Sequence, residues 1–124
     1  MSTHNDSSGR PVAVVHAEIG GDSWRSVVHA QQSATPDHGD WYAITGEAVD
    51  TLRCLAAVVS VLAQQVRGYG HGRVLRDDTG LDPTVRLAQA SSLAAQLRVE
   101  IDHAEATANR FWSQIGHIAV EVNR

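Results

Sequence analysis

The chain has 124 residues and a formal net charge of -4 at pH 7, and its ten Lys and Arg residues are all arginines. This length provides one small domain with a modest core and excludes a second full domain. The arginines are scattered singly, which argues against a protein that binds nucleic acid mainly by neutralising phosphates.

The sequence also lacks the features of a membrane or exported protein. No apolar run approaches the roughly 20 residues that a membrane span needs, and residues 1–10 show no signal-peptide pattern. We therefore expect a cytoplasmic protein that does not enter a membrane. Cys54 is the only cysteine, and its apolar neighbours predict a buried structural thiol.

The N-terminal third has the weakest pattern. Residues 1–10 are rich in Ser, Asn, Asp and Gly and predict a disordered tail, followed by a single helical domain over 11–124. Residues 11–19 are rich in valine and favour a strand, whereas residues 23–34 fit helical spacing slightly better than a returning strand. The sequence leaves open whether this segment is strand or helix. Residues 33–40 predict a loop.

A first long helix is predicted over about 41–67. Apolar residues recur there at spacings of three and four, and Gly68, Gly70 and Gly72 follow. Almost every residue from 55 to 62 is apolar or small, so we expect this helix to contact neighbours on more than one side. The predicted packed face consists of Ile44, Ala48, Leu52, Leu55, Val59, Leu62 and Val66.

A second helix is predicted over about 83–122. Asp82 is suited to an N-cap and Pro83 to the first helical position. With Leu87 at heptad position a, every a and d position is apolar, as in a coiled-coil-like seam. The a row is Leu87, Ala94, Ile101, Ala108, Ile115 and Val122, and the d row is Ala90, Leu97, Ala104, Phe111 and Ile118. The two helices predict a mainly α fold, a long antiparallel helical hairpin.

The predicted helices differ in length. Their spans of about 60 Å and about 40 Å leave the last turns of the second helix without partners in a hairpin. Either residues 12–34 or a second copy of the chain must cover Ile115, Ile118 and Val122. We expect the second copy, and hence a homodimer, while an unknown protein partner stays open.

The block from Asn109 to Ile118 has two interpretations. The block contains either a core aromatic beside a tolerated glycine, or an interface for a second chain in which an aromatic is the anchor and a glycine permits close approach. The residues of this second interpretation are Trp112, Gly116, His117 and Ile118. The predicted interface consists of Phe111, Trp112, Ile115, Gly116, Ile118 and Val122.

No catalytic, cofactor or metal site is predicted. The seven histidines do not form a converging ligand set, and Glu100 with His103 supplies at most half of one. Residues 68–73 lack the Gly-Lys-Ser/Thr ending of a phosphate loop, and no Gly-x-Ser-x-Gly elbow occurs. We therefore expect a protein that is not an enzyme and that self-associates through its helical seam.

Three segments carry a resemblance to a known group: residues 41–47, 73–78 and 111–122. Over about 41–122 the chain resembles small uncharacterised actinobacterial proteins, some of them associated with mobile elements. The resemblance implies a helical hairpin and no established activity. It also keeps open an alternative, an accessory DNA-associated or regulatory protein of a mobile element. That function would need a basic surface from Arg53, Arg67, Arg73 and Arg76, which Asp50, Asp77 and Asp78 dilute.

Overall fold

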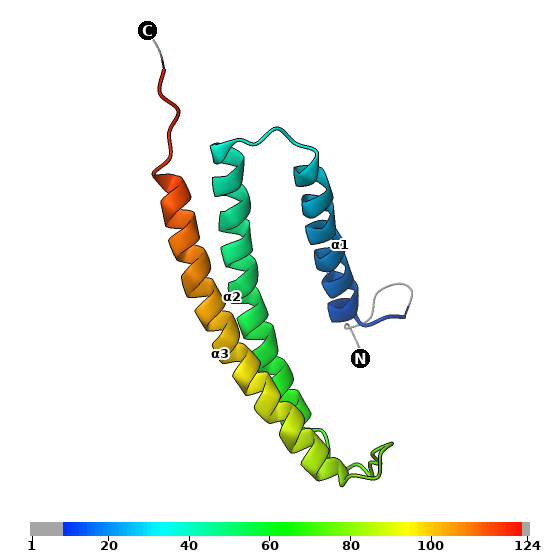
Figure 1. The fold of residues 1–124 in the computed structure, drawn as a ribbon. Coiled ribbons are helices and arrows are strands. Elements are labelled where there is room, and N and C mark those ends of the chain that lie inside the picture. The colour runs from blue at the N-terminus through cyan, green and yellow to red at the C-terminus, as the bar shows by residue number, and fades with distance from the viewer. Residues whose placement is uncertain (1–8, 123–124) are drawn as a thin grey trace. The chain divides into compact units, whose positions relative to one another are not determined.

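The structure, a computed structural model, describes residues 9–122 and is mainly helical, as predicted. Its helices are α1 (Val12–Gln32), α2 (His38–Gly68) and α3 (Pro83–Gly116), and no strand occurs among the described residues (Figure 1). Apart from Gly9 and Arg10, the predicted disordered tail lies outside the described residues. The chain divides into two compact units, Met1–Asp37 and His38–Arg124, which are described separately below. The single domain expected over 11–124 stays a prediction.

The first unit contains α1. The strand favoured for residues 11–19 is not formed, because one helix runs from Val12 through Gly20 and Gly21 to Gln32. Pro11 directly precedes this helix, at a position where its missing N–H removes no helical hydrogen bond. No residue of α1 is buried, so its valines pack no core of their own.

The second unit contains α2 and α3, and their bounds differ from those predicted. α2 begins at His38, before Trp41, and α3 begins at Pro83, where the Asp82 side chain accepts a hydrogen bond of 2.9 Å from the Thr84 N–H. α3 ends at Gly116 rather than at Val122. The helices have 31 and 34 residues, so the predicted excess length of the second helix is wrong.

Asp77 organises the connection between α2 and α3. Its carboxylate accepts hydrogen bonds from the Thr79 N–H at 2.9 Å, the Leu81 N–H at 3.2 Å and Arg86 Nε at 2.8 Å, and also from the Thr79 hydroxyl. The Asp77 side chain is only 7% exposed. The hydrogen bonds from Arg86 and Thr79 hold the pKa of the Asp77 carboxyl well below its usual range. Thus the second half of this connection is tied to the first turn of α3.

α2 and α3 contact each other along their length and run in opposite directions (Figure 1). Three α3 side chains donate to α2 carbonyls: Trp112 Nε1 to Tyr42 at 2.9 Å, Arg98 Nη1 to Ala56 at 3.3 Å and the Ser91 hydroxyl to Ala63 at 3.4 Å. From one bond to the next, the α2 residue advances along the sequence by as many residues as the α3 residue moves back. These bonds therefore define a single antiparallel register for the pair.

The two predicted heptad rows of α3 have different surroundings. Ile115, on the a row, is buried, and the a residues Leu87, Ala94, Ile101 and Ala108 are half-buried. The d row is exposed, with Leu97 45% and Phe111 60% accessible. Instead of the d row, α2 meets the row Ser91, Arg98, Glu105 and Trp112, which is placed one residue later in each heptad.

The packed face of α2 also differs from the predicted one. Its buried residues are Thr45, Val49, Ala56, Val59 and Ala63, of which only Val59 belonged to the predicted packed face. Leu55 and Leu62 are instead about half exposed. Cys54 is exposed, so the prediction of a buried thiol is wrong.

Candidate interaction surface

The exposed rows of α2 and α3 lie on the same side of the pair. In two antiparallel helices, the positions that directly precede the packed residues flank one side of the contact on both helices. We define the apolar face by the large apolar side chains on this side, each between 42% and 65% exposed. These are Trp41, Leu55, Val58 and Leu62 of α2 and Leu93, Leu97 and Phe111 of α3.

The register arranges this face in layers along the helix axes. The contact between Ala56 and Arg98 places Leu55 beside Leu97, and the contact between Tyr42 and Trp112 places Trp41 beside Phe111. By the same step, Ala48 lies beside Ala104 and Leu62 beside Ala90. Layers of large side chains therefore flank a layer of two alanines.

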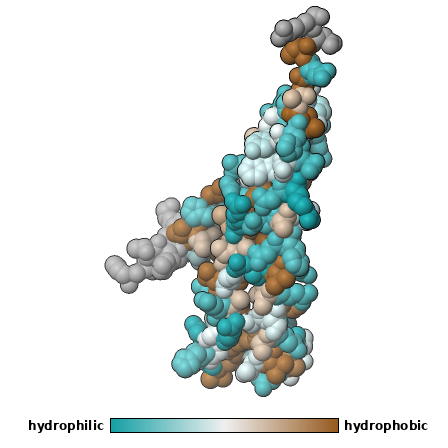
Figure 2. Space-filling model, turned by 90° about the vertical axis from the view of Figure 1, so that its left-hand side faces the viewer, coloured by the Kyte–Doolittle hydropathy of each residue, from teal (hydrophilic) through white to brown (hydrophobic). Residues whose placement is uncertain are grey.

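The other side of the helix pair carries polar contacts. Arg53 Nε lies 3.3 Å from Glu105 Oε2, and Arg98 bonds the Ser60 hydroxyl and lies 3.3 Å from Asp102 Oδ1. These ion pairs are largely exposed and contribute little stability individually. Figure 2 shows one face of the molecule, where apolar residues interrupt an otherwise polar surface at several points. These ion pairs lie on one side of the pair, whereas the large exposed side chains of the apolar face lie on the other.

Two residues of the predicted interface, Trp112 and Gly116, lie against Tyr42 of α2. Trp112 donates to the Tyr42 carbonyl and packs on the Tyr42 ring, with the ring centroids 5.2 Å apart. A Cβ on Gly116 would lie 3.2 Å from Tyr42 Cε2, so this glycine permits a close approach within the chain. Ile115 is buried. The interpretation of a core aromatic beside a glycine therefore describes the surroundings of Trp112.

The remaining predicted interface residues are exposed. Phe111 belongs to the apolar face, whereas Ile118 and Val122 follow the end of α3 and are 55% and 84% accessible. Leu55 and Leu62 were predicted to be packed and are instead surface residues. The available signal was the almost continuous apolar run from 55 to 62, which predicted contacts on more than one side of the helix.

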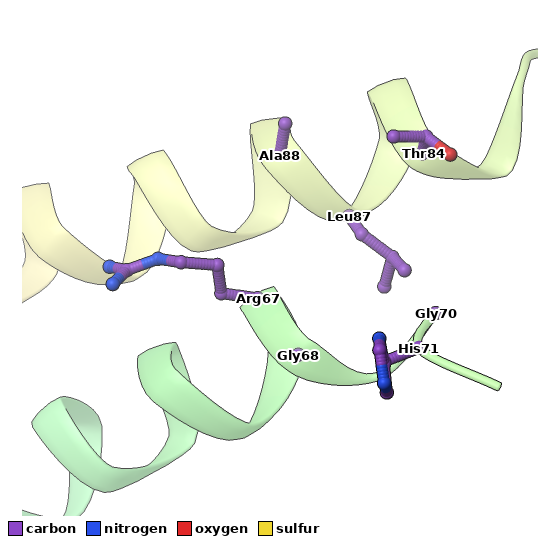
Figure 3. A pocket seen from close by; sticks show the side chains of 7 residues that line it. All are labelled: Arg67, Gly68, Gly70, His71, Thr84, Leu87 and Ala88. Atoms are coloured by element: carbon purple, nitrogen blue, oxygen red, sulfur yellow. The ribbon is translucent and has the colours of Figure 1, made fainter.

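A cavity of about 510 Å³ lies where α2 ends and α3 begins (Figure 3). Arg67 and His71 are its two basic side chains, but they point in different directions and do not converge on one ligand position. Thr84 also lines the cavity, and its N–H is already bonded to Asp82. This cavity therefore has no assembled anion site.

The metal and DNA hypotheses find little geometric support. Within residues 9–122, no group of three or more His, Cys, Asp or Glu side chains is placed to hold a metal ion. Arg53 pairs with Asp50 and Glu105, and Arg73 donates to the Tyr69 carbonyl at 3.0 Å with its guanidinium 4.4 Å from the Tyr69 ring centroid. Two of the four arginines of the basic surface are thus engaged within the chain.

Comparison with known proteins gives no relative. No family model, curated protein or solved structure matches the chain. Among the described helices, none is both long enough and apolar enough to span a membrane.

Proposed function

We propose that this chain is a non-enzymatic, cytoplasmic interaction protein, built on a long antiparallel hairpin of α2 and α3, that self-associates through the apolar face. The observation that carries the proposal is the gathering of half-exposed Trp41, Leu55, Leu62, Leu97 and Phe111 on one side of the pair. Contiguous exposed apolar surface of this kind is typical of a protein–protein contact. The associating surface is thus the exposed d row of α3 with its neighbours on α2, rather than the whole a/d seam.

The expected strength of association follows from the partial exposure of these side chains. Fully burying a large apolar side chain contributes about 1.5–3 kcal/mol, so completing the burial of a half-covered one contributes roughly 1 kcal/mol. Seven such side chains from each of two copies contribute roughly 14 kcal/mol, against about 4–15 kcal/mol for lost freedom on association. The difference ranges from about 10 kcal/mol in favour of the dimer to no net association, and a micromolar dissociation constant, equivalent to about 8 kcal/mol, lies within this range.

The test compares two substitutions on α3. Leu97→Glu places a charge in the middle of the apolar face, whereas Val99→Glu places it at a side chain that is 53% exposed but outside the face. Light scattering coupled to size-exclusion chromatography, from about 1 to 200 μM, should show a dimer for the natural chain and for Val99→Glu. Leu97→Glu should be monomeric and should keep its far-UV circular dichroism, because Leu97 lies at the edge of the contact with α2 and is 45% exposed.

Two outcomes would overturn the proposal. The first is a natural chain that stays monomeric over the whole concentration range. The second is a Leu97→Glu variant that dimerises as well as Val99→Glu. The DNA-associated alternative makes a separate prediction, binding to duplex DNA that weakens steeply as salt rises, whereas association of the apolar face changes little with salt.

A further inference from the structure

We infer that two copies of the chain pack their apolar faces together in antiparallel orientation, α2 against α2 and α3 against α3, as a four-helix bundle. This inference rests on the proposed function and adds the identity and orientation of the occupant. It derives from the order of large and small residues along the face. On α3 that order is self-complementary when the second copy is antiparallel.

The face repeats every seven residues on both helices. Along α2 the row is Trp41, Ala48, Leu55 and Leu62, and along α3 it is Ala90, Leu97, Ala104 and Phe111. Because the helices are antiparallel, these residues form four layers. From the open end to the loop end the layers are Trp41 with Phe111, Ala48 with Ala104, Leu55 with Leu97, and Leu62 with Ala90.

A twofold axis perpendicular to the helices brings large residues against small ones. It places Leu97 over Ala104 of the second copy and Ala48 over its Leu55. By the same operation Phe111 lies over Ala90. Facing positions that alternate large and small side chains fill a bundle core without voids. In this orientation every residue of the α3 row faces one of the other size, as do Ala48 and Leu55 of α2, whereas Trp41 and Leu62 of α2 face each other.

A twofold axis parallel to the helices gives a poorer fit. Each layer then meets its own copy, so Ala48 faces Ala104 and Leu55 faces Leu97. Four alanines would share one layer, next to layers of four leucines and of four aromatic rings. The alanine layer would leave a void and the neighbouring layers would be crowded, and a core at native density accommodates this only if the backbone shifts.

The size of the face is suited to a second copy. The rows from Trp41 to Leu62 and from Ala90 to Phe111 are each about 32 Å long, and two helices side by side are about 20 Å wide, so the face has a footprint of roughly 640 Å². A standard stable interface buries about 800 Å² on each partner. The face therefore lies in the lower part of the standard size range, which is about 1,200–2,000 Å² for both partners together.

Pairwise crosslinking of the full-length chain tests the orientation. Single cysteines are introduced in a Cys54→Ser background, because Cys54 is exposed and is the only cysteine. Two preparations that differ in tag length are mixed, each carrying one cysteine, and treated with a short bismaleimide. Mixed Leu97→Cys and Ala104→Cys chains should give mainly the heterodimeric product, whereas mixed Ala48→Cys and Ala104→Cys chains should give little.

The outcomes separate this inference from the proposed function. A dimer that Leu97→Glu dissociates, but that crosslinks through positions 48 and 104, would retain the function and overturn the antiparallel orientation. No crosslink in either mixture, with the chain monomeric, would overturn both and assign the face to a different occupant. Crosslinks between positions 97 and 104 would support the antiparallel bundle, and their loss on adding Leu55→Glu to both chains would show that they form through the apolar face.

Discussion

Gly46 lies beneath the indole of Trp112, and its replacement by alanine tests whether that ring is held within the chain. A Cβ at position 46 would lie 3.0 Å from Trp112 Cζ2 and 3.3 Å from Cε2. The ring has little freedom to move away, because its Nε1 donates to the Tyr42 carbonyl at 2.9 Å and its face packs on the Tyr42 ring. The added methyl group therefore forces one of these contacts to give.

Two opposing effects determine the change in the free energy of unfolding. Alanine is favoured over glycine inside a helix by about 1 kcal/mol. Overpacking a fitted contact costs about 1–3 kcal/mol. We expect Gly46→Ala to destabilise the protein by about 1 kcal/mol, with the steric cost exceeding the gain in helix propensity.

A double-mutant cycle separates these effects. Trp112→Leu removes the three indole atoms nearest to the new methyl group, so Gly46→Ala should stabilise that background by about 1 kcal/mol. The coupling between the two sites is then about 2 kcal/mol. Urea unfolding followed by far-UV circular dichroism, at one protein concentration for all four chains, measures it.

Gly20→Ala provides a matched control inside α1, because nothing lies within 4 Å of the Cβ site at Gly20. This variant should only gain helix propensity. Equal stabilisation by Gly46→Ala with and without Trp112 would refute the reasoning. It would mean that the indole does not rest on Gly46 in solution and is available for an interface, as the sequence suggested.

Two further predictions concern the core and the connection. Val49→Ala should destabilise the protein by about 2 kcal/mol in urea unfolding, because the Val49 side chain is fully buried, while Val74→Ala, at a fully exposed position, should change it by less than about 0.5 kcal/mol. Asp77→Asn should lower stability at pH 7, because Arg86 and Thr79 depress the pKa of the native carboxyl. The stability that the carboxylate provides is present above its unfolded pKa of about 4 and is lost as pH falls through the lower folded pKa. The free energy of unfolding of the variant should therefore fall less steeply with pH below about pH 4. Equal slopes for both chains would contradict this account.

The sequence predicted the long helices because their signals are local. The start of α3 is determined by Asp82 and Pro83, a cap and a first-turn residue whose roles depend on nothing distant. Its end was predicted too late, because Ile118 and Val122 continue the heptad spacing although the helix ends at Gly116. Apolar periodicity does not record where a helix stops.

The packed face of α3 was harder to predict, because both heptad rows are apolar. The contact with α2 uses Ser91 and Arg98, whose polar groups bond the Ala63 and Ala56 carbonyls. A polar side chain that donates to a neighbouring helix backbone looks like a surface residue in the sequence. The apolar d row was therefore predicted to form the seam, while its residues Leu97 and Phe111 are exposed. Likewise, the valines of residues 11–19 favoured a strand by propensity alone, and α1 forms there instead.

The hydrogen bonds that the Asp77 carboxylate accepts make the two halves of the α2–α3 connection differ in how well they tolerate a change in length. Residues 69–76 precede Asp77, and a residue inserted there can bulge into solvent and leave both helices in place. Residues 77–86 are tied by the bonds from Asp77 to Thr79, Leu81 and Arg86, so an insertion there must either break those bonds or displace the start of α3. Such a displacement moves every layer of α3 past its counterpart on α2. In related sequences, length variation should therefore accumulate ahead of Asp77 and stop at it.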